Sequence, residues 1–426
     1  MPKLALSAPT DRPRQVLDLS DAYRILDAVG KMENVKHERS VTEPGTEPAA
    51  ALAAARDGLF RFPHVDRFEE WLHAPAPLES THPRFDIRRA VPAEFDAIYD
   101  LVNDAFGFKR SRPRYDWMYR RNPYGTARCW VVLDRASGRL VGSIASWPWP
   151  MAWGAQGVEG AQDGDSVVAP GWQRQGIDGL RVEVWRSHAW QAKTIALSWP
   201  NQKSRGAGIK RGRAARMMGP VPMAVLILNA KAYLAGHDWP VVLSAAGGAM
   251  VDAALTIWRK LAIRGGTDLA VEPVRRFESS FDEVTQRCMT WPGFWSPHDA
   301  GFLNWRYLDH PSSHYLAFAL VDGGKLAGYS VLKIDGRASW LMEFVAPVSP
   351  RRLASALLLH LIETARAAGC SHLRFSAPPP WRHWKLFHAA GFLPAPSEIY
   401  LWPAGEEPGL RQLSMWQWVP GDMDDV

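Results

Sequence analysis

The stretch Asp165-Ser-Val-Val-Ala-Pro-Gly-Trp-Gln-Arg-Gln-Gly-Ile-Asp-Gly-Leu180 decides the fold. We expect a strand that ends at Pro170 and a helix that begins near Gly176 and runs to about Ala192. A loop that leads into a helix N-terminus presents unpaired backbone N–H groups, and the helix dipole adds partial positive charge there. Gly176 would let this backbone approach a pyrophosphate, and Arg174 could add charge-assisted hydrogen bonds. The stretch therefore predicts an anion site, although an ordinary strand-to-helix turn remains the alternative.

An internal repeat surrounds this stretch. The spacing W-x-Y-x-x-x-P falls on Trp117, Tyr119 and Pro123, and again on Trp305, Tyr307 and Pro311. Two strands joined by a short turn follow in both copies, and later the tripeptide at 168–170 recurs at 345–347. Between the hairpin and this tripeptide the offset between the copies falls from 186 to 177 residues, so the first copy carries nine extra residues within 147–162. The order of elements predicts a mixed α/β domain that is used twice.

The predicted organisation has four parts. Residues 1–84 form an N-terminal segment, expected to be flexible and linker-like because Pro, Thr, Glu and Ala dominate its middle. Residues 85–235 form the domain with the anion loop, and 236–270 form a helical connection between the domains. Residues 271–426 form a second domain with a degenerate loop.

Composition narrows the classes of function. Lys and Arg (50) exceed Asp and Glu (44) by only six in 426 residues, so no DNA partner is expected. Cys129, Cys288 and Cys370 lie far apart without C-x-x-C spacing, which argues against a disulfide framework and a metal site and favours the cytoplasm. The most apolar run, 241–258, is interrupted by glycines and an aspartate and falls short of the ~20 apolar residues that span a bilayer.

Several motifs resemble one protein family. Val168, Pro170, Gln173, Gly176 and Ile177 match the pattern V-x-P-x-x-Q/R-x-x-G-I, which resembles the acyl-CoA pyrophosphate loop of the GNAT superfamily of acetyl-CoA-dependent N-acyltransferases. One branch of that superfamily also has the other motifs of this chain: W-x-Y-x-x-N-P-x-G at 117–125, Asp165, W-P-N-x-x-S at 199–204, N-W-R-Y at 304–307, G-F at 391–392 and G-D-x-D at 421–424.

The resemblance covers about 86–426 and implies two tandem GNAT-like domains. Each would contain a mostly antiparallel sheet that splays between its fourth and fifth strands. It further implies acetyl-CoA, or another acyl-CoA, as the acyl donor and an amine of a small molecule or saccharide as the acceptor. The residues expected to hold the donor are Val167, Val168, Gln173, Arg174, Gln175, Gly176 and Ile177.

Acyl transfer to an amine needs a proton acceptor, a polarised carbonyl and a stabilised thiolate. Backbone N–H groups near Val167 would polarise the carbonyl. Asp165, on the same strand face as Asp163, is predicted to act as a base or to orient the substrate, with a structural hydrogen bond as the alternative. Asn201 would hold the pantetheine amide or a water, or would cap a helix. Ser204 would protonate the thiolate, or would have a capping or packing role.

The chain also departs from the family pattern. Asp178 follows Gly176 and Ile177 where the family usually has a small residue. Gly208 stands where many members have a general-acid Tyr. The second loop, 345–354, lacks the glycine, and Phe387 takes the corresponding Tyr position. We therefore expect a degenerate second copy that supports the first.

The nine extra residues of the first copy lie in a segment rich in Trp and Pro. Trp149 and Trp153 on this Pro-stiffened loop could form rigid walls for a sugar or a ring. They are predicted to border the acceptor mouth with Tyr119 nearby. Sealing the contact between the domains is the alternative.

The sequence thus predicts a cytoplasmic N-acetyltransferase whose first domain is catalytic. A Fem-type aminoacyl-tRNA-dependent transferase is one alternative, because that type also pairs two such domains and the pI here is about 9.2. A non-catalytic acyl-CoA-binding or scaffold protein is another, which the glycine at 208 favours.

Overall fold

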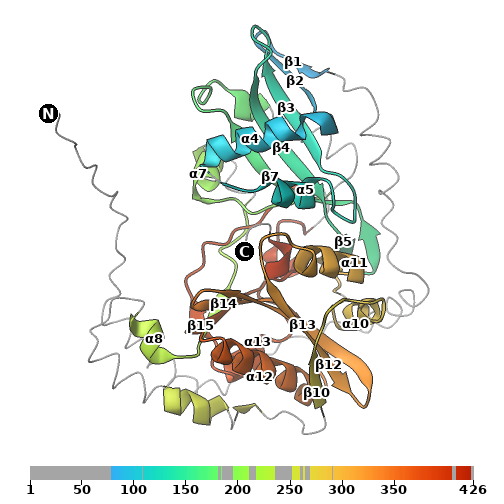
Figure 1. Cartoon of the computed structure of the whole chain (residues 1–426), viewed down its shortest axis with the longest axis vertical. Coiled ribbons are helices and arrows are strands. Elements are labelled where there is room, and N and C mark those ends of the chain that lie inside the picture. Colours follow the sequence, from blue (N-terminus) through green and yellow to red (C-terminus); the bar gives the residue numbers. More distant parts are fainter. Residues whose placement is uncertain are drawn as a thin grey trace, which may run out of the picture. The chain divides into compact units, whose positions relative to one another are not determined.

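The structure is a computed structural model that describes residues 78–423 apart from 108, 181–183, 185–194, 211–216, 236–251, 260–261, 264–268, 290 and 405–408. Nearly all of the expected N-terminal segment and most of the expected interdomain connection therefore lie outside the described residues. The described strands form two seven-stranded sheets and one four-stranded sheet (Figure 1). Helices and mixed, mostly antiparallel sheets confirm the predicted α/β class.

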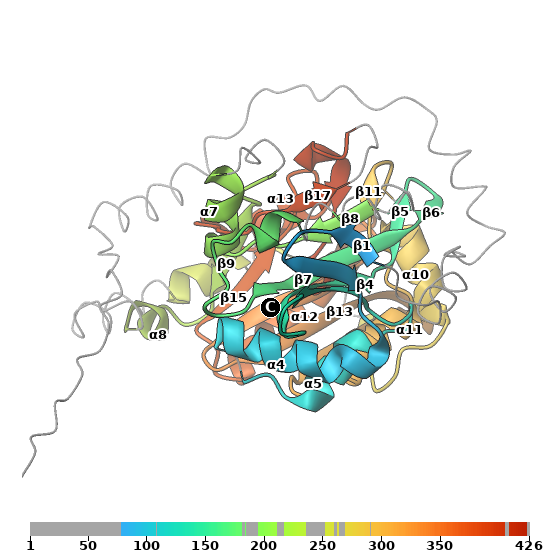
Figure 2. The ribbon, with the colours of Figure 1, turned by 90° about the horizontal axis from the view of Figure 1, so that it is seen from above.

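The first sheet has the strand order β1-β2-β3-β4-β7-β8-β17. Its described neighbours are antiparallel, except that β7 and β8 are parallel. Helices α4 (Phe95–Phe106) and α5 (Arg112–Tyr119) lie on one side of it (Figures 1 and 2). The strands are β1 (Leu78–Thr81), β2 (Phe85–Arg89), β3 (Arg128–Asp134), β4 (Leu140–Pro148), β7 (Gly160–Val168), β8 (Ile195–Ser198) and β17 (Trp402–Ala404).

The second sheet repeats this pattern in the order β10-β12-β13-β14-β15-β9-β16, with β14 and β15 parallel. Helix α12 (Arg351–Ala367) packs on it through Leu353, Leu357 and Leu361, which share one helix face. Helix α10 (Ser280–Met289) packs on the opposite face. The strands are β9 (Met223–Ile227), β10 (Leu269–Pro273), β12 (Tyr315–Asp322), β13 (Lys325–Asp335), β14 (Ala338–Val345), β15 (His372–Ser376) and β16 (Leu393–Ala395).

The two sheets exchange a strand. β9 comes from the first half of the chain, yet it lies between β15 and β16 of the second sheet. β17 comes from the second half and pairs with β8 of the first sheet. Strands from each side of residue 235 thus pair with strands from the other side. The domain boundary predicted at this residue stays a prediction.

The inserted residues of the first copy form a hairpin of β5 (Met151–Trp153) and β6 (Gln156–Val158). This hairpin joins β11 (Phe294–Trp295) and β18 (Trp416–Gln417) in the four-stranded sheet. The remaining elements are η1 (Pro92–Glu94), α7 (Gln202–Lys210), α8 (Ala230–Ala235), α11 (Ala300–Leu303), η3 (Asn304–Leu308), α13 (Trp384–Ala389), η4 (Leu413–Met415) and η5 (Pro420–Asp422).

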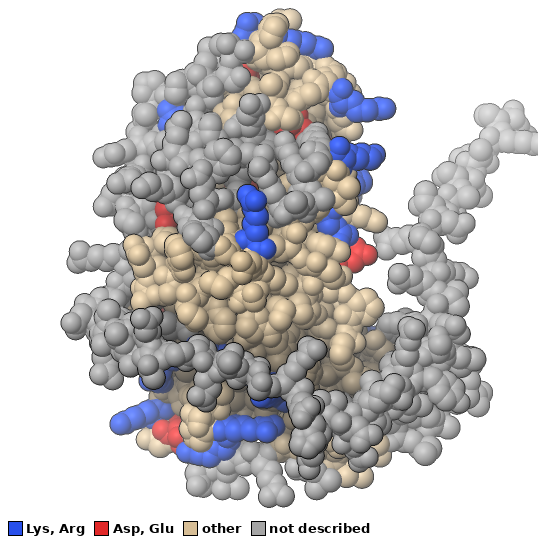
Figure 3. Space-filling model, turned by 180° about the vertical axis from the view of Figure 1, so that it is seen from behind, with Lys and Arg blue, Asp and Glu red and all other residues tan. Residues whose placement is uncertain are grey.

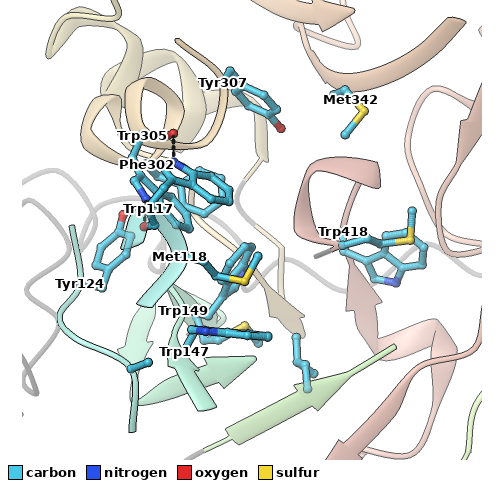
Figure 4. Close-up of a cluster of buried hydrophobic side chains, with 14 of the residues drawn as sticks. Trp117, Met118, Tyr124, Trp147, Trp149, Phe302, Trp305, Tyr307, Met342 and Trp418 are labelled. Carbon is cyan, nitrogen blue, oxygen red and sulfur yellow. Dashed lines mark hydrogen bonds between the residues drawn. The ribbon is translucent and has the colours of Figure 1, made fainter. Parts of the chain in front are cut away.

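One buried aromatic core contains residues from both halves of the chain. At its centre Trp117 and Trp305 stack with ring centroids 4.6 Å apart (Figure 4). Each indole donates to the other residue's carbonyl oxygen, with Nε1–O distances of 2.7 and 3.0 Å. The two W-x-Y motifs thus hold each other, and both tyrosines of these motifs lie in the same core.

Candidate active site

The candidate site begins where β7 separates from β8. The two strands pair only over Gly160–Gln162, although β7 continues to Val168. The second sheet separates in the same way, because β14 pairs with β15 only over Ala338–Trp340. The predicted splay is thus present in both sheets, between the fourth and fifth strands of the second and, because β1 adds a strand at the edge, between the fifth and sixth of the first.

A β-bulge interrupts β7 inside this split. Ser143 of β4 pairs with Val167, whereas Ala145 pairs with Gly164, so an extra residue is accommodated on β7. Within the bulge Asp165 has a φ of +44°. This backbone conformation is uncommon for residues other than glycine and marks local strain.

The carboxylate of Asp165 is buried and engaged by two donors. Arg110 Nη1 lies 3.0 and 2.8 Å from its two oxygens, and the side chains are 8% and 5% exposed. Tyr119 donates its hydroxyl to Oδ2 at 2.8 Å. Burial and the negative charge of Asp165 raise the pKa of Tyr119 well above its usual value, so the phenol stays protonated and donates.

The loop after β7 has the geometry that the sequence predicts. Gly171, Arg174 and Gly176 have φ values of +81°, +63° and +82°. Residues 173–176 are exposed, and the following helix begins at Ile177, whose side chain is 1% exposed. The N–H groups of the next turn bond to the Gly176 carbonyl, which makes Gly176 the cap of this helix. The expected extension of the helix to about Ala192 lies largely outside the described residues.

Side chains of the predicted donor site fix this loop. Gln175 donates to the Gly171 carbonyl at 3.3 Å and accepts from Arg84 Nη1 at 2.8 Å. The Arg84 guanidinium also lies over the Trp172 ring at 4.9 Å. Ile177 packs in the core beneath β4, where Gly142 leaves room for it. Val167 and Val168 pair with β4, and the exposed Gln173 and Arg174 extend from the loop.

Asn201 and Ser204 lie at the start of α7, and both are exposed. Asn201 Oδ1 accepts from the Ser204 N–H at 2.9 Å, which is a helix N-cap. The capping alternative for Asn201 is thus present in the structure. The catalytic roles of both residues stay predictions.

Gly208 faces the exchanged strand. A Cβ at this position would lie 2.7 Å from Cη2 of Trp402, so the indole of β17 fills the space beside this turn of α7. A tyrosine at position 208 could not fit without displacing Trp402. Trp402, from the second half of the chain, therefore occupies the space that the expected general-acid tyrosine would need.

The structure separates the three predicted acceptor residues. Tyr119 is bonded to Asp165. Trp149 is 3% exposed, packs edge-on against Phe302 and donates to Asp422 Oδ1 at 3.3 Å, so it lies in the contact between the halves (Figure 4). Trp153 is 38% exposed and stacks on Phe294. Bordering the acceptor mouth stays a prediction for both tryptophans.

The second half contains a buried polar cluster to which the N-W-R-Y and G-D-x-D motifs contribute Arg306, Tyr307 and Asp422, whereas His298 and Glu343 were not singled out from the sequence. Tyr307 donates to Glu343 of β14, and His298 lies 2.8 Å from Glu343 and 2.9 Å from Asp422. Burial alone would lower the pKa of His298, but the charges of Glu343 and Asp422 overcome this effect and raise it to about 10. Arg306 donates to the carbonyls that flank Asp422. The C-terminal turn η5 thereby lies on β14, and its Asp422 carbonyl also accepts from Gln162 of β7 at 3.2 Å and from Trp199, just after β8, at 3.1 Å.

The geometry can now be compared with known proteins. Residues 86–181, which contain the strands β2 to β7 and the loop, match the family model of the acetyltransferase (GNAT) domain. These residues form a GNAT domain. No curated protein matches the sequence. The predicted resemblance to the GNAT family and the predicted α/β fold class are thus confirmed, the family match ends at residue 181, and the tandem arrangement stays a prediction.

Solved structures support the same fold for most of the chain. A probable N-acyltransferase of Enterococcus faecalis aligns over 74% of this chain and 72% of its own, with 11% identity and a TM-score of 0.54. A GCN5-related N-acetyltransferase of Anabaena variabilis aligns over 75% and 72%, with 14% identity and a TM-score of 0.52. At such low identity these likenesses establish the GNAT acyltransferase fold alone.

Further features of the described residues concern membrane-spanning helices, metal-binding groups and disulfides. No helix among them is long and apolar enough to cross a membrane. The same residues contain no group of three or more His, Cys, Asp or Glu side chains that could hold a metal ion. Cys129, Cys288 and Cys370 are buried thiols outside any disulfide.

Proposed function

We propose that this chain is an acyl-CoA-dependent N-acyltransferase with its active site where β7 separates from β8. The observation that carries the proposal is the continuity of three features within residues 160–180: the split, the bulge at Asp165 and the exposed loop that leads into the helix at Ile177. Acetyl-CoA is the proposed donor, and an amine of a small molecule or saccharide is the proposed acceptor.

The loop suits the pyrophosphate of the donor. Its exposed backbone at 173–176 lies at a helix N-terminus, where N–H groups and the helix dipole favour an anion. Arg174 is exposed in the loop, and Arg84 contacts it through Gln175. The acyl end of the donor would then follow β7 into the split.

The reaction requires few groups. The acceptor nitrogen attacks the thioester carbonyl carbon, the C–S bond breaks, the sulfur leaves as the CoA thiolate and one amine proton must be removed. Backbone N–H groups near Val167 would polarise the carbonyl. Asp165 already accepts from Arg110 and Tyr119, which favours orientation of the amine and proton removal through a water over direct transfer.

Departure of the thiolate takes place without a hydroxyl at position 208. Trp402 fills the space beside Gly208. A thiol with a pKa of about 8.5, as in cysteine, leaves as a thiolate near neutral pH, so a weak donor such as Ser204 would suffice. A non-catalytic acyl-CoA-binding protein is the second candidate, because this same Trp402 contact removes the usual acid.

We also propose that the second sheet is a degenerate GNAT-like domain in tandem with the first, and that the protein acts in the cytoplasm. The shared strand order of the two sheets supports the tandem arrangement. For the Fem-type alternative, a continuous basic surface for tRNA would be expected. On the face drawn in Figure 3, Lys and Arg side chains are scattered instead of forming one patch.

Calorimetry with acetyl-CoA and CoA tests donor binding, and a free-thiol release screen against amino sugars, polyamines and peptides tests turnover. We expect binding below millimolar concentration and thiol release with at least one amine. Absence of binding at millimolar concentration would overturn the proposal. Binding without thiol release from any amine would establish the non-catalytic candidate instead.

A matched pair of variants locates the donor site. Gly176→Val and Gly138→Val both place a β-branched residue at a positive φ, +82° and +66°, where a Cβ meets nothing within 4 Å. Both changes should therefore cost similar stability. Only Gly176→Val should weaken acetyl-CoA binding, by at least about tenfold, because its side chain would stand between the loop and the pyrophosphate.

A further inference from the structure

We propose that Arg110 is a positioning residue for acyl transfer, because it holds the β7 bulge in the conformation that directs this strand into the split. The proposal rests on the proposed function for the meaning of that conformation. Arg110 lies between α4 and α5, far from β7 in sequence, and belongs to none of the motifs that indicate the family.

Arg110 itself is firmly held by the helices on either side of it. Asn103 of α4 clamps its backbone twice, because Asn103 Nδ2 donates to the Arg110 carbonyl at 3.1 Å and the Arg110 N–H donates to Asn103 Oδ1 at 3.2 Å. Tyr115 of α5 also donates to Asn103 Oδ1, at 2.9 Å. The Tyr115 ring lies under the guanidinium, 5.0 Å from its centre, and Tyr99 stacks on that ring at 4.4 Å. Asn103 and Tyr115 therefore hold the backbone and the guanidinium of Arg110 through contacts that do not involve Asp165.

The guanidinium of Arg110 in turn pairs with a buried carboxylate. Arg110 Nη1 bonds both oxygens of Asp165, and Tyr119 bonds one of them from the other side. A buried carboxylate is stable only when it is paired and hydrogen-bonded. These bonds hold the side chain of Asp165, while pairing with β4 holds the backbone on both sides of it. The strained positive φ persists because these contacts together leave the residue no other conformation.

The second sheet offers a comparison inside the chain. Aligned on the Val-Ala-Pro tripeptides, Met342 of β14 corresponds to Asp165, and β14 also has a bulge there, because Val331 pairs with Glu343 and Leu332 with Leu341. Met342 is absent from the described residues that have a positive φ. The second sheet therefore forms its bulge without a positive φ and without an arginine, and the buried carboxylate beside that bulge, Glu343, has His298 as its cation instead. The combination of a strained φ and a firmly held arginine belongs to the first sheet, and we therefore assign it a role in the transfer step.

That role is placement of the strand beside the donor. Val167 and Val168 follow the bulge directly and lead into the loop at 171–176. A displacement of about 1 Å at such a point can lower the rate of a transfer step by about a hundredfold. Loss of the pair should therefore affect kcat strongly and donor binding weakly, because the loop is anchored separately through Arg84 and Gln175.

The test compares Arg110→Gln with Arg112→Gln in the full chain. Arg112 is the matched control, because its ion pairs with Asp96 and Asp100 are on the surface. We expect Arg110→Gln to lower kcat for thiol release by about 10- to 100-fold with the KM for acetyl-CoA changed less than about twofold. Arg110→Lys should recover part of kcat. Unchanged kcat in Arg110→Gln would overturn the proposal.

A double variant separates a loss of activity from a loss of stability, and because Asp165 is itself proposed to act on the amine, the decisive outcome in it is recovery of kcat. Arg110→Gln leaves a buried charge unpaired and should lower Tm, whereas Arg110→Gln combined with Asp165→Asn removes that charge and should restore Tm. We expect kcat to stay low in the double variant, and recovery of kcat together with Tm would overturn the proposal. If the wild-type protein transfers no acyl group, the proposed function fails. In that case, the hydrogen-exchange rates of the backbone amides at 164–168 still test the role of Arg110. We expect faster exchange in Arg110→Gln than in Arg112→Gln, and equal rates would show that Arg110 does not stabilise the bulge.

Discussion

The two seven-stranded sheets separate at corresponding places, and a tyrosine bonds a carboxylate at each. In the first sheet Tyr119 donates to Asp165, and in the second Tyr307 donates to Glu343. Both tyrosines come from the W-x-Y motifs. The tyrosine–carboxylate contact is therefore part of the shared architecture, and by itself it does not indicate activity.

What surrounds these contacts differs. In the first sheet the carboxylate faces Arg110, and an exposed loop at 171–176 follows the strand. In the second sheet the turn η5 lies on the contact, so closely that a Cβ on Gly421 would be 2.0 Å from the Tyr307 hydroxyl oxygen. The comparison teaches that the first carboxylate lies on a strained strand beside an exposed loop, whereas the second is covered by the turn η5, which also accepts from Gln162 of β7 and from Trp199 after β8.

The largest effect is expected from His298, whose removal would open the second cluster. His298→Asn leaves Glu343 and Asp422 as two buried carboxylates without their cation, which should cost about 3–5 kcal/mol of the free energy of unfolding. Chemical denaturation measures this loss. A loss below about 1 kcal/mol would show that the cluster does not hold the turn in place.

The same histidine predicts a pH dependence of stability. The groups facing it are Glu343 of β14, Asp422 of η5, the Ser296 hydroxyl and the Phe302 ring. Since its pKa rises from 6.5 to about 10 on folding, its contribution to stability is complete below about pH 6.5 and is lost as the pH rises through about 10. The unfolding free energy of the wild type should fall over this range, more steeply than that of His298→Asn. Parallel pH profiles would contradict the assignment.

A smaller loss is expected from Gly421→Ala, which tests how closely the turn lies on the second contact. The added methyl would also be 2.3 Å from Glu343 Oε1, so the turn must move, at a cost of about 3 kcal/mol. Gly206→Ala is the control, because a Cβ there meets nothing within 4 Å and α7 should gain helix propensity. Equal stability of the two variants in denaturant would refute the close contact of η5 with Tyr307 and Glu343. Acetyl-CoA affinity should be unchanged in both.

Gly208→Ala tests the contact that replaces the expected acid. Its Cβ would lie 2.7 and 2.9 Å from two ring atoms of Trp402, so β17 must shift away from β8, at a cost of about 1–2 kcal/mol. Thermal denaturation measures the change. Addition of Trp402→Phe, which shortens the ring, should recover part of it, and an additive double variant would contradict the contact.

Local features of the first domain could be predicted from its sequence. The loop, the helix at Ile177 and the hairpin β3–β4 depend on turn residues and apolar periodicity, and the structure contains them. The split was expected from the resemblance to the GNAT superfamily, and the structure contains it as well. Asn201 was predicted with two roles, and the structure contains its capping geometry. Such features are encoded by neighbours in the sequence, where period and turn chemistry are informative.

Long-range pairings could not be predicted. The exchange of β9 and β17 is a pairing between strands that lie far apart in the sequence, and neither strand carries a local signal for its partner. Arg110 meets Asp165 across 55 residues, and Asp422 meets His298 across 124. No spacing rule joins such partners. A buried carboxylate predicted on a strand does, however, require a cation or a donor, and this requirement could have prompted a search for one.

The smallest effect on stability is expected from Trp153→Ala, and it separates the two interpretations of the inserted hairpin. Trp153 is 38% exposed and stacks on Phe294 at 5.4 Å, so its removal should cost about 1 kcal/mol, whereas Trp149→Ala removes a side chain that is 3% exposed and should cost about 3–5 kcal/mol.

If the hairpin borders the acceptor mouth, Trp153→Ala should raise the acceptor's KM several-fold and leave acetyl-CoA affinity unchanged, because the exposed ring would contact only the acceptor. Steady-state kinetics at saturating donor measure this split. If the hairpin serves only to join the halves, the acceptor's KM should not change in a variant this stable. The two tryptophans thus answer different questions: Trp149 reports on the contact between the halves, and Trp153 reports on what the hairpin does at its exposed side.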